Sequence, residues 1–358
     1  MQAGRFPICV TPPSADTGVM TYARSQIAPP GEFGCFHVVT RCVRRAFLCG
    51  SDRLSGRNFD HRRQWIEDRI RFLADSFAVS IYSYAVMSNH THIVLSVDPE
   101  AALGWTDAEV ADRWLRVFPG AMAEASSDKQ KQRVRMALLS TPDRLKEIRE
   151  RLGSLSWFMR ALNEPIARMA NQEDNCTGRF WEGRFKCQAL LEPQAVVSAM
   201  AYVDLNPARA RMTDTLEESD HTSIKFRLES RKPICGKAYK LSNAGLKPVA
   251  GLDAGALLDM TESSYIDLVQ WTGEQLHPMK RGKLISRSDL ENRPPEVVMK
   301  LSKHSDRWLR QVRGTESKYY RAIGSAEALM AKAAELGQRW MQGVSGERAW
   351  MILRSQTE

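Results

Sequence analysis

Two histidines, in the segment His90-Thr91-His92, have the clearest capacity for chemistry in this chain. The sequence HTHIVLSV, from His90 to Val97, is rich in β-branched residues and predicts a strand. Because alternate side chains of a strand point to the same face, both imidazoles should project together, as a divalent metal site requires. A chance H-x-H pair on an exposed strand accounts for the same residues, and the pair alone does not decide between the two interpretations.

A tyrosine and an asparagine one helical turn apart form the second candidate group, in the sequence AMAYVDLNP. We predict a helix that begins at Pro193 and ends at Asn206-Pro207, because proline favours a first turn and disfavours helical geometry in the residue before it. Tyr202 and Asn206 are i and i+4, so they share a helix face. A tyrosine at the edge of the core, followed by a helix-ending asparagine, is the simpler alternative.

The third candidate group lies in the sequence GRFWEGRFKC, at 178–187. Cations alternate there with aromatic rings, which suits a groove for single-stranded nucleic acid. The cations are Arg179, Arg184 and Lys186, and the rings are Phe180, Trp181 and Phe185. A basic strand with core aromatics has the same pattern.

Together these segments resemble a known family. YAVMSNHTHIVL is similar to the HUH signature of the Y1 transposases of the IS200/IS605 type, and FHVVTR at 36–41 resembles the first strand of that family. GRFWEGRF and AYVDLNPARA are similar to its REP-associated branch, the RAYT proteins. The resemblance covers roughly residues 33–212, interrupted by a polar insertion.

The resemblance implies a role for individual residues. His90 and His92 match the two metal ligands, Tyr202 matches the nucleophile, and Asn206 lies where the third ligand is found, although many relatives have a longer glutamine there. Mg²⁺ or Mn²⁺ is the implied cofactor. His37 lies in the first-strand motif and we expect it to serve packing. The expected DNA contacts are the cations and one ring of these motifs: Arg41, Arg179, Trp181, Arg184, Lys186 and Arg209.

The implied function is that of a DNA transposase, a single-stranded DNA endonuclease and strand transferase acting through a 5′-phosphotyrosine, on hairpin-forming repeat DNA in a bacterial cytoplasm. Monomer and homodimer both remain open. Two other classes of protein are alternatives: a metal-dependent hydrolase using the histidine pair, and a non-catalytic nucleic-acid-binding protein domesticated from a transposase. The hydrolase is disfavoured because no H-E-x-x-H or H-x-H-x-D-H motif occurs. The intact His90, His92 and Tyr202 disfavour the second.

Composition agrees with a nucleic-acid partner but is weak by itself. The 358 residues carry 51 Lys and Arg against 42 Asp and Glu, a net charge of +9. Seven cysteines without a C-x-x-C motif argue against a disulfide framework or zinc ribbon and for a reducing compartment. No apolar run approaches the roughly 20 residues that a membrane span needs.

The elements that must position these residues predict an α+β fold: an antiparallel sheet with helices on one face, as in RRM-like HUH cores, plus a helical C-terminal region. We expect strands at 35–40, 79–87 and 90–97, the last two as a hairpin, and helices at 61–78 and 154–171. The expected divisions are an irregular arm at 1–30, a catalytic domain at 31–224 with a helical insertion at about 99–152, and a basic helical domain at 225–358. Helices near 255–271, 303–313 and 325–341 should form the last, with phosphate contacts from its basic 279–323 stretch.

Overall fold

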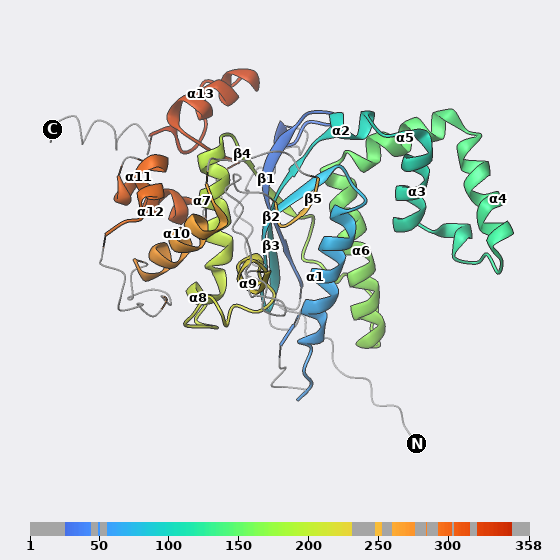
Figure 1. The fold of residues 1–358 in the computed structure, drawn as a ribbon, viewed down its shortest axis with the longest axis horizontal. Helices are drawn as coiled ribbons and strands as arrows, with labels where there is room; N and C mark the ends of the chain where they lie inside the picture. Colours follow the sequence, from blue (N-terminus) through green and yellow to red (C-terminus); the bar gives the residue numbers. More distant parts are fainter. Residues whose placement is uncertain are drawn as a thin grey trace, which may run out of the picture.

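A central sheet organises the molecule, as Figure 1 shows. The computed structural model describes residues 26–43, 49–50, 56–230, 248–252, 260–275, 284, 293–302, 304–315 and 321–345. Within these residues the sheet has six strands in the order β5-β2-β3-β1-β4-β6. The neighbours pair antiparallel except β4 and β6, which are parallel. The α+β fold class is therefore confirmed, with one short parallel pair in a sheet expected to be antiparallel throughout.

The predicted central strands form as expected. β1 spans Gly34–Arg41, β2 spans Val79–Val86 and β3 spans His90–Val97. Strands β2 and β3 form the predicted hairpin, closed by a hydrogen bond from the Met87 amide to the His90 carbonyl (2.9 Å). β3 lies between β2 and β1, so the histidines are on a central strand.

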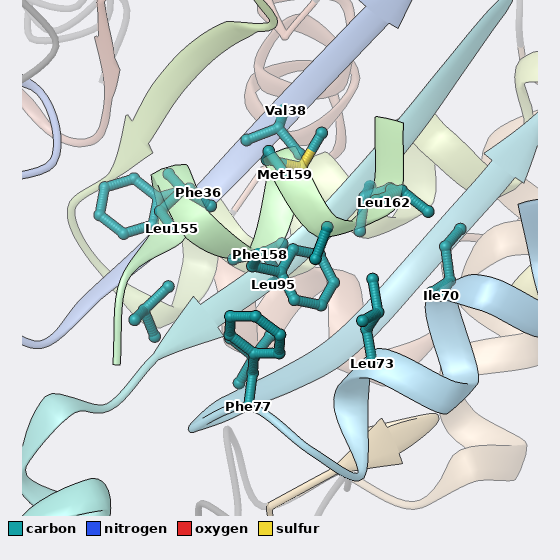
Figure 2. Close-up of a cluster of buried hydrophobic side chains, with 14 of the residues drawn as sticks. Phe36, Val38, Ile70, Leu73, Phe77, Leu95, Leu155, Phe158, Met159 and Leu162 are labelled. Carbon is teal, nitrogen blue, oxygen red and sulfur yellow. The ribbon is translucent and has the colours of Figure 1, made fainter. Parts of the chain in front are cut away.

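One face of the sheet packs on helices α1 (His61–Ala74) and α6 (Leu155–Glu173). Figure 2 shows the core between this sheet face and the two helices, with Phe77, Phe158 and Leu95 at its centre. Helix α1 ends four residues before the predicted boundary, because the chain turns from Asp75 into β2. Five helical elements follow β3: α2 (Pro99–Leu103), α3 (Asp107–Val117), η2 (Gly120–Met122), α4 (Asp128–Leu139) and α5 (Pro142–Leu152).

The other face is covered as well, which corrects the expectation of helices on one face only. Strand β4 (Lys186–Leu190) leads into α7 (Pro193–Asp204), which lies against β2 and β3, and the chain continues through α8 (Asn206–Arg209) and α9 (Ser223–Ser230). Apolar residues of α7 share a core with Val94 and Ala85 of the sheet. Alternation therefore buries both faces of β3, and the histidine strand is not exposed.

The C-terminal region completes this second core. Its described elements are β5 (Ala250–Gly251), α10 (Glu262–Glu274), α11 (Glu296–Ser302), α12 (Ser305–Gly314), β6 (Ala322–Ile323) and α13 (Ala326–Glu335). Trp308 of α12 and Tyr265 of α10 are buried in the same cluster as Val203 of α7. In Figure 1 these helices lie beside α7. Buried residues before and after position 225 therefore share one hydrophobic cluster.

Two further expectations concern the ends of the chain and membranes. Residues 1–25 of the expected irregular arm, and much of the basic 279–323 stretch, lie outside the described residues. Among the helices that the structure describes, none combines the length and apolar character that crossing a membrane requires.

A buried ion pair joins the two helices of the first face. The Arg62 side chain of α1 has no exposed surface, and its guanidinium donates to Glu173 (2.7 Å) and Asp174 (2.6 Å) at the end of α6. The same guanidinium lies over the Phe59 ring, 4.1 Å from its centroid. Removing one member of a buried ion pair leaves the opposite charge without that compensation, and this lowers the free energy of unfolding.

We predict that Arg62→Leu lowers the free energy of unfolding by about 3–5 kcal/mol, measured by urea denaturation, because it removes the buried guanidinium that binds Asp174, whose side chain is 6% exposed, and Glu173. Arg168→Leu is the matched control on α6, since Arg168 is 72% exposed and forms an exposed pair with Glu164. That change should cost no more than about 1 kcal/mol. Equal effects of the two changes would contradict the role given to the buried pair.

Candidate functional site

The register between β3 and β1 places basic and imidazole side chains on one face. His90 is opposite Arg41, and His92 is opposite Val39. Since directly paired residues share a face, and positions two apart along a strand do so as well, His37 lies on this face too. His90 and His92 are neighbours within it, with ring centroids 4.7 Å apart.

Strand β4 extends the same face on the other side of β1. Lys186 is opposite Val39, and Gln188 is opposite His37. Arg41 and Lys186 are exposed at this end of the sheet, whereas His37 is buried and Gln188 is partly buried. On this face, the exposed cations Arg41 and Lys186 lie at one end of the strands, and the less exposed His37 and Gln188 lie toward their middle.

Helix α7 lies across this face and brings Tyr202 to the histidines. The phenol ring has its centroid 5.7 Å from that of His92 and 5.9 Å from that of His37, edge-on to both. Tyr202 is 6% exposed and His92 is also 6% exposed. The two histidines and the tyrosine predicted from the sequence thus lie together in one largely buried cluster.

A buried carboxylate one half-turn along α7 fixes the helix in this position. Asp204 has no exposed surface and accepts hydrogen bonds from the hydroxyls of Ser83, Ser223 and Tyr265 and from the Ile224 amide. These donors come from β2, α9 and α10. Burial raises the pKa of Asp204, against the opposing effect of the Ser223 and Tyr265 hydrogen bonds. Asp204 therefore joins α7 to three separate segments.

Burial keeps the imidazoles neutral near pH 7. It lowers the pKa of His37 to about 4, against the hydrogen bond to Gln188. Burial first, and then the charge of Arg41, lowers the pKa of His90 to about 4. Burial and the positive charges of neighbouring groups, Arg209 among them, hold the pKa of His92 well below its ordinary value. A neutral imidazole has the nitrogen lone pair that a metal ligand needs.

Hydrogen bonds orient the imidazole rings of His90 and His92. His37 Nε2 is 2.9 Å from His92 Nδ1, and His37 Nδ1 is 2.7 Å from the amide oxygen of Gln188. His90 Nδ1 is 2.5 Å from the amide oxygen of Asn89. His37 therefore does more than the packing expected of it, and sequence reasoning missed Gln188 and Asn89. Strand alternation puts His37 and Arg41 on one face, but the register that joins this face to His92 is not visible in the sequence.

The chain after α7 contributes two more of the predicted residues. The helix ends at Asp204 and a short helix, α8, starts at Asn206 with Pro207 in its first turn, close to the predicted break. Asn206 is 9% exposed, and its amide nitrogen has no hydrogen-bond partner among the described residues. The guanidinium of Arg209 lies over the Tyr202 ring, 4.4 Å from its centroid.

These donors fit a divalent metal with an open coordination shell. Within the described residues no group of three or more His, Cys, Asp or Glu is arranged to hold a metal ion. The ligands predicted from the sequence are the imidazoles of His90 and His92, which lie side by side, and the amide of Asn206, which follows Tyr202 by four residues. Two or three protein ligands leave room for water or phosphate oxygens, as in catalytic rather than structural sites.

The GRFWEGRF segment lies beside the Arg41 end of β1. The Glu182 amide donates to the Arg41 carbonyl (2.9 Å), and Trp181 and Cys42 form an isolated antiparallel β-bridge. Arg179 and Arg184 are exposed in this segment. Trp181 is half-buried against the first core, and its indole nitrogen donates to the Asn163 carbonyl of α6 (2.8 Å). The segment therefore places exposed cations beside the Arg41 end of β1, while Trp181 attaches the segment to α6.

A cavity of about 400 Å³ opens at the opposite end of β1. Its lining includes Cys35, Tyr82 and Pro193 but none of His90, His92 and Tyr202. It is thus separate from the cluster of imidazoles and phenol.

The buried histidines predict a loss of stability in acid. Their ordinary pKa is 6.5 and the folded pKa of His37 and of His90 is about 4, so the unfolded chain binds more protons between these values. The free energy of unfolding therefore falls as pH is lowered through this window, by up to about 1.4 kcal/mol per pH unit for each histidine. Asp204, whose pKa is raised, acts in the opposite sense.

The contribution of one histidine is isolated by urea unfolding of wild type and His90→Gln at pH 7.5 and pH 5.0. The variant should lose less stability between the two pH values than wild type does. An identical pH response in the His90 variant would contradict the lowered pKa.

Comparison with known proteins adds little to this geometry. No protein-family model matches the sequence, and no curated protein matches it. One solved structure, of a REP-associated tyrosine transposase bound to a REP hairpin, is similar over 63% of this chain and 96% of that chain, with 11% identity and a TM-score of 0.36. A likeness of this extent supports no conclusion about function, so the functional argument depends on the residues of the site.

Proposed function

We propose that this chain cleaves and rejoins single-stranded DNA as a tyrosine transposase of the HUH type, with Tyr202 as the nucleophile. The observation that carries the proposal is the cluster itself. A phenol on α7 lies within 6 Å, ring centroid to ring centroid, of the metal-ligand candidate His92, beside the guanidinium of Arg209. A phenol, neutral imidazoles and a guanidinium in one cluster suit attack on a phosphodiester.

The reaction is a transesterification with balanced atoms. The phenolic oxygen of Tyr202 forms a bond to phosphorus, the bond from phosphorus to the 3′ oxygen breaks, and the phenolic proton is lost as the leaving oxygen gains one. The product is a 5′-phosphotyrosine and a free 3′ hydroxyl. Because the number of phosphodiester bonds is conserved, a later 3′ hydroxyl can reverse the attack and join strands without ATP.

His90, His92 and Asn206 would hold Mg²⁺ or Mn²⁺. When bound, the cation would polarise the scissile phosphate and offset charge in the transition state. Imidazole ligands favour Mn²⁺ over Mg²⁺, which prefers oxygen. Arg209 would interact with a phosphate oxygen at Tyr202; its guanidinium lies over the phenol ring and so limits the orientations of that ring.

The exposed cations near the Arg41 end of β1 would bind the DNA backbone. Arg41 and Lys186 project from the same sheet face as the histidines, and Arg179 and Arg184 are exposed on the adjoining segment. Contacts of this kind bind phosphates without reading sequence. We propose a single strand or a hairpin formed by repeat DNA as the substrate, and a monomer or homodimer as the active form.

The decisive variant is Tyr202→Phe. Incubation of wild type with labelled hairpin DNA and Mn²⁺ should yield a protein–DNA adduct that survives denaturing electrophoresis. Tyr202→Phe should abolish the adduct, because it removes only the nucleophilic oxygen, and it should leave DNA binding intact. Tyr82→Phe is the matched control, since Tyr82 lies on the same side of the sheet and donates to Ser96, and it should still form the adduct.

Other outcomes separate the rival functions. A metal-dependent hydrolase would cut the DNA without forming an adduct. A non-catalytic binding protein would bind without cutting. Either result from the wild-type protein would overturn the proposal.

A second prediction concerns the phosphate contacts. Arg41→Ala should weaken hairpin binding and reduce the slope of log affinity against log salt by about one, because one phosphate contact is lost. Fluorescence anisotropy at several salt concentrations measures both quantities. Arg144→Ala, on the inserted helix α5, should change neither. An unchanged slope for Arg41→Ala would remove this residue from the interface.

A further inference from the structure

A chain of hydrogen bonds runs from Gln188 through His37 to His92. We propose that His37 and Gln188 are positioning residues that fix His92 in the tautomer protonated on Nδ1, so that its Nε2 lone pair is directed into the site. The inference deepens the proposed function and rests on it, because it concerns how His92 presents its ligand atom to a divalent cation.

The geometry of the two rings is that of a hydrogen bond in the ring plane. Their planes differ by only 7° and their centroids are 5.2 Å apart, while His37 Nε2 and His92 Nδ1 are separated by 2.9 Å. Nitrogens this close on rings whose centroids are so far apart require that the rings meet edge to edge. The contact is therefore a directed bond and not a face-to-face stack.

The acceptor at the end of the chain determines where each proton lies. The Gln188 amide oxygen, 2.7 Å from His37 Nδ1, can only accept, so His37 must carry its proton on Nδ1. In the neutral ring, His37 Nε2 is then an acceptor, and the donor to it must be the Nδ1–H of His92. His37 is 2% exposed and His92 6% exposed, and such burial disfavours the charged forms.

The arrangement along the sheet gives the direction of the remaining nitrogen. His37 is opposite Val94, which follows His92 by two residues, while His90 precedes His92 by two. His92 therefore lies between His37 and His90. With Nδ1 held toward His37, Nε2 is on the far side of the ring from His37.

The other ligand candidate is held in the same way. The Asn89 amide oxygen is 2.5 Å from His90 Nδ1, so His90 also carries its proton there and leaves Nε2 available. Two separate acceptors thus impose one tautomer on both histidines. Metal-binding histidines are commonly oriented by an acceptor on the second nitrogen, and loss of that acceptor typically costs 10- to 100-fold in affinity.

The first measurement is the tautomer itself, in the full-length protein without metal or DNA. With ¹⁵N-labelled histidine, two-dimensional NMR correlating ring protons with ring nitrogens distinguishes the protonated nitrogen of each imidazole. We expect His37 and His92 to be protonated on Nδ1. A His92 protonated on Nε2 would overturn the proposal whatever the activity of the protein.

The second measurement is Mn²⁺ affinity, from electron paramagnetic resonance of the free ion. His37→Leu removes the acceptor and should weaken binding about 10- to 100-fold. His37→Gln retains an acceptor oxygen at a similar reach and should restore most of the affinity, which a role in packing alone would not predict. Equal weakening by both changes would contradict the proposal. If His37→Leu does not fold, Gln188→Leu replaces it, with the expectation that His92 loses its single tautomer.

These outcomes are separate from those of the proposed function. If wild type forms no DNA adduct but His92 is protonated on Nδ1 and Mn²⁺ affinity follows the acceptor, the positioning role holds and the transposase function fails. If the adduct forms normally and His92 is protonated on Nε2, the function holds and the positioning role fails.

Discussion

The geometry of the site depends on the hydrogen bonds accepted by the buried carboxylate of Asp204. It accepts hydrogen bonds from β2, α9 and α10 at once, and it lies two residues after Tyr202 on the same helix. A charge or polar group buried without partners costs several kcal/mol, so this carboxylate is stable only where its donors converge. The position of α7 is thereby fixed, and the distance between the phenol and the imidazoles follows from it.

The C-terminal region acquires a structural role through the same interaction. Tyr265, on α10, donates to Asp204, and Trp308 packs in the core beneath α7. Helix α7 is therefore held between the sheet and the C-terminal helices. Residues far along the chain from the histidines thus hold the tyrosine in place.

Sequence patterns predicted the local features well, because local chemistry determines them. Alternation gave β3 at His90–Val97 and put both histidines on one face, and proline placed the start of α7 at Pro193. The features that were missed depend on contacts between distant segments. The bonds of His37 to His92 and Gln188 depend on strand register, and the second helical layer depends on the packing of Trp308 and Tyr265 around α7. Neither leaves a periodic signal in the sequence.

The central claim is that the oxygen of one tyrosine becomes bonded to DNA beside the paired imidazoles. The most direct test is to react wild type with hairpin DNA and Mn²⁺, digest the protein and the DNA, and identify the residue that carries the nucleotide by tandem mass spectrometry. The account predicts a nucleotide attached to Tyr202 through its 5′ phosphate. Attachment to another residue, or cleaved DNA with no attached nucleotide, would contradict it.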